Sequence, residues 1–245
     1  LLQPGNQALA SLSTIGGGSS NLITLMGAYA TIGGGYGNTA SGLIAAVGGG
    51  QGNIASDGGA TVSGGFRNTA SGEYATVGGG YWNTASGDYA TVGGWHNTAN
   101  MTATTVSGGY RNTASGEYAT IGGGSWNDVN DEHAAIGGGE SNWITATHGT
   151  IAGGYNITVT GDYAAVGGGQ DNSASGQEAF VGGGLGNQAT GTRAMVGSGW
   201  YNTASNNVAV VAGGASNTAS GEYSTVPGGS GNTAAGNFSF AAGRR

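Results

Sequence analysis

Apolar residues recur along the chain with a period of 15 residues. In the repeat 78–92, whose sequence is GGGYWNTASGDYATV, positions eight and thirteen are alanine and position fifteen is valine. Other repeats likewise place an apolar residue at position eight and Val or Ile at position fifteen. Successive side chains of a strand point to opposite faces, so positions thirteen and fifteen share one face while twelve and fourteen share the other. The pattern predicts short strands around a thin core.

Glycine-rich segments separate the two apolar parts of each repeat. Gly-Gly-Gly opens half of the repeats and Ser-Gly often follows the first strand, and we expect both to supply turns with positive φ. Each repeat then forms one coil of two short strands and two tight corners. Stacked coils pair each strand with its copy about 4.8 Å away. The sequence thus predicts an all-β fold, a parallel β-solenoid of about 16 coils with a 15-residue repeat.

The repeat continues in register from residue 1 to residue 241. The repeat ending at Ile32 carries two extra residues around Leu25 and Met26, and the repeat ending at Val106 lacks one glycine before Trp95. No linker interrupts the array, so residues 1–245 are predicted to form a single domain. Because neither end shows the polar cap of an isolated solenoid, we expect that the chain is excised from or joined to further segments, or that its ends stack on other copies.

Composition excludes several classes of protein. The chain has 57 glycines but only two prolines, and it lacks the Gly-X-Y triplets of collagen. So much glycine also excludes a helical protein, and no apolar run is long enough to span a membrane. Only five basic residues, all arginine, oppose twelve acidic ones, giving a net charge of −7. We therefore expect neither a nucleic-acid partner nor direct membrane insertion.

Asparagine occupies the sixth position of nearly every repeat. Stacked amides can hydrogen-bond along the axis of a solenoid, but asparagine also tolerates turn conformations, and the sequence leaves both interpretations open. The predicted structural ladder consists of Asn38, Asn53, Asn68, Asn83, Asn97, Asn112, Asn127, Asn142, Asn172, Asn187, Asn202, Asn217 and Asn232.

Repeats such as FRNTASGEYATVG, which begins at Phe66 and ends at Gly78, resemble the head repeats of trimeric autotransporter adhesins, the YadA-like head. They are also similar to repeat arrays of other bacterial surface proteins and of phage fibres. The resemblance implies a left-handed parallel β-roll, three chains packed into one head, and adhesion to host matrix or to neighbouring cells. The chain departs from the family in its 15-residue period, against about 14, and in lacking any segment like the neck, stalk or anchor.

Aromatic residues concentrate at positions four, five and twelve. They are too large for a core built of alanine, so we expect them on the surface, where an aromatic stripe is typical of an interface or a binding site. The ordinary preference of tyrosine for strand faces is the alternative interpretation. The candidate interface or binding residues are Tyr29, Tyr74, Tyr89, Tyr118, Tyr163, Tyr223, Tyr81, Trp82, Tyr110 and Trp200.

Residues that could carry chemistry are sparse. His133 and His148 both occupy position twelve, one coil apart, but no third ligand column accompanies them. Acidic residues gather at position eleven, where they form either a solvated edge or, with corner carbonyl oxygens, a calcium site. The calcium candidates are Glu73, Asp88, Glu117 and Glu132. With no Ser-His-Asp constellation and no phosphate loop, we expect no catalytic residue, no enzyme activity and no other cofactor.

These observations favour a non-enzymatic structural or adhesive component of an extracellular surface fibre. Its expected partners are copies of itself, in a homotrimer or a head-to-tail filament, and a glycan or protein on a host or neighbouring cell. The alternative function is ice binding, because positions seven and fourteen carry columns of threonine. Those columns are interrupted, for example by Ala46, Phe180 and Met195 at position fourteen.

Overall fold

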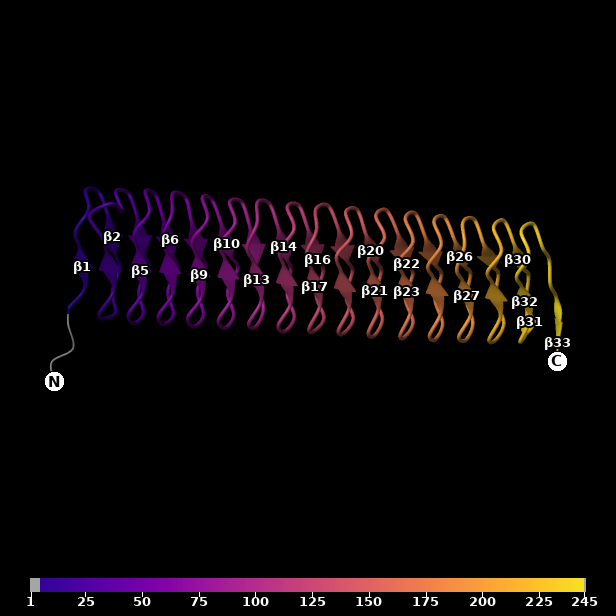
Figure 1. Ribbon diagram of the computed structural model, residues 1–245. Coiled ribbons are helices and arrows are strands. Elements are labelled where there is room, and N and C mark those ends of the chain that lie inside the picture. The colour runs from indigo at the N-terminus through magenta and orange to yellow at the C-terminus, as the bar shows by residue number, and fades with distance from the viewer. Residues whose placement is uncertain (1–4, 245) are drawn as a thin grey trace. The chain divides into compact units, whose positions relative to one another are not determined.

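The computed structural model describes residues 5–244 and confirms the predicted all-β parallel β-solenoid. Only strands, turns and bends occur among these residues, without any helix. Contacts divide the chain into two compact units, Leu1–Gly124 and Ser125–Arg245, each built from the same coils (Figure 1). With no helix in the described range, no helical segment there could cross a lipid bilayer.

The first unit contains two parallel sheets, and every strand has two residues. One sheet consists of β1 (Gln7–Ala8), β3 (Leu22–Ile23), β5 (Thr39–Ala40), β7 (Ile54–Ala55), β9 (Thr69–Ala70), β11 (Thr84–Ala85), β13 (Thr98–Ala99) and β15 (Thr113–Ala114). The other consists of β2 (Thr14–Ile15), β4 (Thr31–Ile32), β6 (Ala46–Val47), β8 (Thr61–Val62), β10 (Thr76–Val77), β12 (Thr91–Val92), β14 (Thr105–Val106) and β16 (Thr120–Ile121).

The second unit repeats this arrangement. One sheet consists of β17 (Asp128–Val129), β19 (Trp143–Ile144), β21 (Thr158–Val159), β23 (Ser173–Ala174), β25 (Gln188–Ala189), β27 (Thr203–Ala204), β29 (Thr218–Ala219) and β32 (Thr233–Ala234). The other consists of β18 (Ala135–Ile136), β20 (Thr150–Ile151), β22 (Ala165–Val166), β24 (Phe180–Val181), β26 (Met195–Val196), β28 (Val210–Val211) and β30 (Thr225–Val226). A separate pair joins β31 (Gly229–Ser230) to β33 (Gly243–Arg244).

Register follows the sequence repeat, and the core is thin. Thr76 pairs with Thr91 and Val77 with Val92, so identical columns lie above one another. Positions eight, thirteen and fifteen point inward: Ala85, Ala90 and Val92 are buried, whereas the alternating threonines face outward. The alternation that predicted the strands therefore also identifies the core.

Two corners connect the strands of each coil. We call positions one to six the glycine corner, for example residues 78–83, and positions nine to thirteen the serine corner, for example residues 86–90. The glycine corner adds a third ladder that the sequence did not predict, because position four forms isolated parallel bridges such as Phe66 to Tyr81 and Tyr81 to Trp95. Coils are thus joined by backbone pairing at three places.

The expectation that both glycine motifs supply positive φ is correct at one corner and wrong at the other. Gly80, the third glycine of its triplet, has φ of 101°. Gly87 of Ser-Gly has no positive φ, and a Cβ there would collide with the carbonyl oxygen of Met101 in the next coil. The left-handed residues are instead at positions five and twelve, as in Trp82 and Tyr89, with φ of 54° and 58°. Glycine at the serine corner therefore permits close stacking of coils.

Irregular repeats leave the register intact. The two extra residues near Leu25 and Met26 enlarge an outward turn, in which both side chains are strongly exposed. Where the repeat ending at Val106 lacks a glycine, Thr84 still pairs with Thr98, and the side-chain amide of Asn83 still donates to the carbonyl of Gly94. Insertions and deletions are absorbed at the corners.

Candidate functional site

The asparagines of position six are buried and bridge neighbouring coils. The side-chain nitrogen of Asn68 donates to the carbonyls of Gly64 at 3.0 Å and Gly80 at 2.9 Å, and its Oδ1 accepts the backbone N–H of Asn83 at 2.9 Å. Direct amide-to-amide bonds also occur, from Asn83 to Asn68 at 3.1 Å. None of these residues has a positive φ. Each amide therefore satisfies corner backbone groups in its own coil and in the next.

Burial is nearly uniform along this column. Of the predicted ladder residues only Asn232 is half-buried; the others are buried, and Asn21 joins them at the start of the first unit. Ile157 replaces asparagine once, and it keeps its backbone N–H bonded to Oδ1 of Asn142 at 3.0 Å. The buried residues Asn38, Asn53, Asn68, Asn83, Asn97, Asn112, Asn127, Asn142, Asn172, Asn187, Asn202 and Asn217 have a structural place and are not accessible to a ligand.

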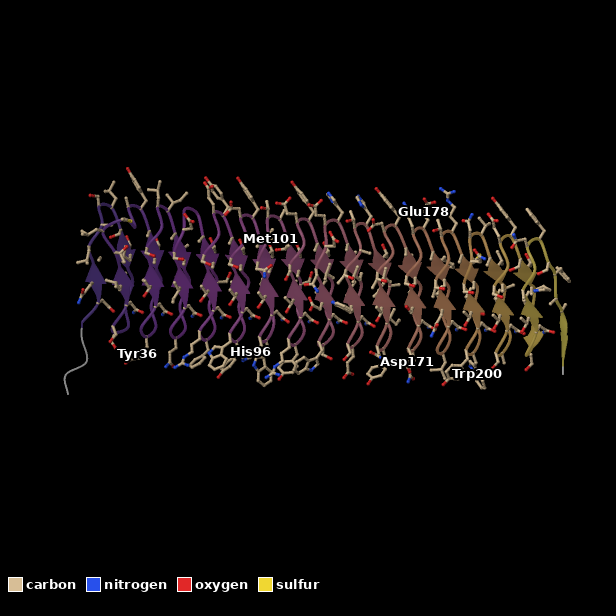
Figure 2. All side chains as sticks on the ribbon, in the orientation of Figure 1. Tyr36, His96, Met101, Asp171, Glu178 and Trp200 are labelled. Carbon is tan, nitrogen blue, oxygen red and sulfur yellow. The ribbon has the colours of Figure 1, made fainter. Side chains whose placement is uncertain are left out.

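Aromatic rings gather on the glycine corner of the first unit, over four consecutive coils. The ring of Phe66 stacks on Tyr81 with centroids 4.9 Å apart and planes inclined by 9°. Further contacts join Tyr81 to Trp95 edge-on at 5.9 Å, and Trp95 to Tyr110 at 5.2 Å. Trp82 packs against His96 at 4.7 Å. Figure 2 shows these crowded rings along the edge that carries Tyr36 and His96.

Two arginines lie among these rings. The guanidinium of Arg67 is 5.2 Å from the centroid of Phe66 and 5.6 Å from that of Trp82. Arg111 lies over Tyr110 at 5.2 Å. Such cation–π contacts orient an exposed guanidinium. We call this surface the aromatic–arginine strip; it consists of Phe66, Arg67, Tyr81, Trp82, Trp95, His96, Tyr110 and Arg111.

Charge in the first unit is segregated between the two corners. Both of its arginines lie at position five on the glycine corner, whereas all of its carboxylates lie at positions ten and eleven on the serine corner. Those carboxylates are Asp57, Glu73, Asp88 and Glu117. The strip is therefore a locally cationic surface on an acidic protein.

The equivalent corner of the second unit has the opposite charge. Tyr155 and Trp200 are exposed at position four, but Glu140 and Asp171 occupy positions four and five of nearby coils. Asp171 accepts a hydrogen bond from the side chain of Asn156 at 2.7 Å. Figure 2 shows Asp171 and Trp200 along this edge. The second unit thus has aromatic residues at this corner but no arginine at position five.

Position twelve forms an aromatic column on the serine corner of each unit. Tyr74 stacks on Tyr89 at 5.5 Å in the first unit. In the second, Tyr163 stacks on His148 at 4.8 Å, and Tyr223 on Phe238 at 5.1 Å. The predicted residues of this position-twelve column are all exposed: Tyr29, Tyr74, Tyr89, Tyr118, Tyr163 and Tyr223.

The two histidines and the calcium candidates lie on the same corner. His133 stacks on His148 with centroids 4.9 Å apart. The Oδ1 atom of Asp88 accepts a hydrogen bond from the backbone N–H of Glu73 at 2.9 Å. This bond uses a carboxylate oxygen that a cation would need as a ligand. Glu117 lies in the first unit and Glu132 in the second. Within residues 5–244, no three or more His, Asp or Glu side chains are grouped so as to hold a metal ion.

Burial raises the pKa of Asp128 in β17 above its usual value, an effect that a hydrogen bond from Asn130 partly offsets. Its Oδ1 is buried without a hydrogen-bond partner. On the surface, Arg193 pairs with Glu178 at 2.9 Å and holds the pKa of that carboxyl below its usual value.

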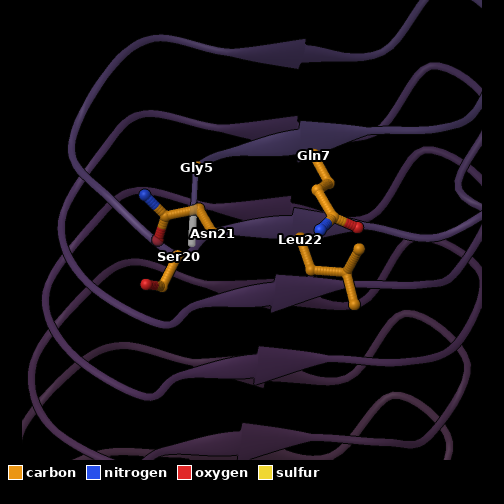
Figure 3. Close-up of a pocket in the computed structure, with 5 residues that line it drawn as sticks. All are labelled: Gly5, Gln7, Ser20, Asn21 and Leu22. Atoms are coloured by element: carbon orange, nitrogen blue, oxygen red, sulfur yellow. The ribbon is translucent and has the colours of Figure 1, made fainter. Parts of the chain in front are cut away.

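A shallow hollow of about 150 Å³ lies in the first coils (Figure 3). Its lining residues are Gly5, Gln7, Ser20, Asn21 and Leu22. The side chain of Asn21 is already bonded to the carbonyls of Gly17 and Gly35. None of these described lining residues is titratable, so they offer neither an acid nor a base.

Sequence reasoning identified the aromatic positions but not the arginines among them. Tyr81 and Trp82 are exposed and Tyr110 is half-buried within the strip, and Trp200 is exposed in the second unit. Arg67, His96 and Arg111 were missed as site residues, although their shared position five was a signal.

No protein-family model matches the chain, and a search of curated proteins found no match.

Proposed function

We propose that this protein is a non-enzymatic structural and adhesive element of an extracellular surface fibre, and that it assembles with copies of itself. The observation that carries the proposal is the position-twelve column. Its stacked rings are exposed on both units of a solenoid whose interior is filled by alanine, valine and isoleucine. Exposed aromatic rows are typical of contact surfaces between proteins.

The interior of the coils is filled with side chains, which supports a function carried by the outer surface. Enzymes usually bind substrate in a concave pocket with converging polar groups, whereas the buried side chains of these coils are nearly all small apolar residues or hydrogen-bonded asparagines. Backbone pairing along both units gives a stiff scaffold that can present repeated side chains at regular intervals. The resemblance to adhesin head repeats agrees with such a scaffold and adds the expectation of a trimer.

Light-scattering mass and negative-stain electron microscopy of the purified chain test this proposal. We expect either particles of about 70 kDa, three times the chain mass of 23.5 kDa, or fibres of indefinite mass. The variant Tyr74→Asn/Tyr89→Asn should weaken assembly, because asparagine accepts the left-handed backbone but removes the rings. Tyr36→Asn on the other corner is the control. A single 23.5 kDa species at all concentrations would contradict the proposal.

Ice binding is a second candidate function, favoured by one observation. Five threonines at position fourteen of the first unit lie in register without interruption, facing outward on β8, β10, β12, β14 and β16: Thr61, Thr76, Thr91, Thr105 and Thr120. Regular hydroxyl and methyl groups on a flat sheet can order water. Thermal hysteresis of the purified chain tests this function. A gap between the melting and freezing temperatures that Thr91→Lys abolishes would support ice binding. The absence of this gap in the unaltered chain would exclude ice binding.

A further inference from the structure

We propose that the aromatic–arginine strip of the first unit binds an acidic polysaccharide, a chain of sugars that carries carboxylate groups. The inference rests on the adhesive part of the proposed function and names its ligand class. Three properties of the strip support it: flat exposed rings, two oriented guanidinium groups, and the absence of carboxylates from its corner.

The rings suit sugars. Tyr81, Trp82 and Trp95 are each between 38% and 54% exposed, so much of each ring remains open to a ligand. The face of an aromatic ring carries negative potential, and it attracts the C–H groups that line the face of a sugar ring. Because the rings recur once per coil, about 4.8 Å apart, they match a ligand that also repeats along its length.

The arginines make the site selective for anions. Arg67 and Arg111 are three coils apart, roughly 14 Å at the usual strand spacing. Each is oriented over a ring and can form a bidentate contact with a carboxylate. Because the carboxylates of this unit lie on the opposite corner, the strip attracts an anion despite the net charge of −7.

The spacing of charge favours a polysaccharide over a nucleic acid. A nucleic acid carries a phosphate on every nucleotide, and its binding depends on neutralising many of them. Two arginines across four coils, with no lysine in the chain, provide few such contacts. A polymer of sugars with widely spaced carboxylates fits two guanidinium groups separated by exposed rings.

Calorimetric titration of the full chain with oligogalacturonate tests the proposal. We expect binding that weakens as salt is added, and weaker binding of a neutral cello-oligosaccharide. The variant Arg67→Gln/Arg111→Gln should bind oligogalacturonate about tenfold or more weakly than the unaltered chain. Trp95→Ala should weaken the binding of both oligosaccharides. All three altered side chains lie at the surface of the corner, so circular dichroism should remain unchanged.

Matched controls come from the second unit. Trp200→Ala removes an exposed ring from the same position four, and Arg193→Gln removes an arginine outside the strip; both should bind like the unaltered chain. Failure of the unaltered chain to bind oligogalacturonate would overturn the proposal. So would equal losses in the control variants, or tighter binding of a single-stranded oligonucleotide.

Assembly and sugar binding are measured separately. A chain that stays a monomer but binds oligogalacturonate through the strip would contradict the proposed fibre and leave this inference standing. A chain that assembles but does not bind oligogalacturonate would overturn this inference and leave the fibre standing.

Discussion

The buried amide of asparagine accounts for the strictest column in the sequence. The amide of Asn68, for example, accepts one backbone N–H and donates to two carbonyls, so it adds to the backbone bridges of the glycine corner. Buried polar groups without partners cost free energy, and complete satisfaction of this column is therefore a condition for stacking coils closely.

Substitution of one ladder residue should destabilise the protein. Asn68→Ala leaves the carbonyls of Gly64 and Gly80 and the N–H of Asn83 without their side-chain partner inside a buried corner. We expect a loss of about 3 kcal/mol in the free energy of unfolding, measured by urea denaturation. Asn100→Ala, at an exposed asparagine outside the column, is the control. Equal stability of the two variants would contradict the structural role of the ladder.

Asp128 should make stability depend on pH. Its pKa is raised in the folded protein, so the folded state holds its proton to a higher pH than the unfolded chain, in which the usual value is 3.8. The carboxyl therefore costs stability at neutral pH, and this cost disappears below about pH 3.8, where both states are protonated.

The consensus substitution Asp128→Thr should remove that cost. We expect the variant to be more stable than the unaltered chain at pH 7, and the gain to shrink as the pH falls to 3. Thermal unfolding at a series of pH values measures it. Asp57→Asn, which removes an exposed carboxyl, is the control. A gain independent of pH would refute the role of burial at Asp128.

Strands of two residues are stable here because nearly all of them are paired on both sides. A single coil buries little apolar surface, and its strands gain backbone partners from the coils above and below at positions four, seven to eight and fourteen to fifteen. Every corner must therefore fit the short distance between coils, and glycine at the serine corner leaves room for that close approach.

Enlarging that glycine should separate two coils. In Gly87→Ala the new Cβ would collide with the carbonyl of Met101, which is backbone and cannot rotate away. We expect a destabilisation of about 3 kcal/mol, measured by urea denaturation. Gly108→Ala is the matched control, since no atom lies within 4 Å of a Cβ built there. If both variants unfolded at the same urea concentration, close stacking would not explain the conserved spacing of these glycines within the array.

Sequence periodicity predicted the coil, its strands and its core because position eight is apolar in every repeat and position fifteen nearly always β-branched. It did not predict which residues adopt positive φ, because Trp82 and Tyr89 are unusual in that conformation and the nearby glycines are the obvious candidates. It also missed Arg67 and Arg111, since position five varies from repeat to repeat. Their significance depends on the rings of neighbouring coils and on where the carboxylates lie.

At the scale of the whole molecule, the same coil supports surfaces of different chemistry. The glycine corner of the first unit carries arginine, and that of the second carries Glu140 and Asp171, although the backbone is the same. The position-twelve column lies on the other corner in both units. Assembly and ligand binding can therefore use separate surfaces.

Hydroxyl-radical footprinting of the assembled chain tests this claim most directly. We expect that oxidation of Tyr74, Tyr89 and Tyr163 falls sharply on assembly, because copies bury the position-twelve column, whereas Trp95 stays as reactive as in the dissociated chain. Unchanged oxidation of the three tyrosines in the assembled protein, with protection of Trp95 instead, would contradict it.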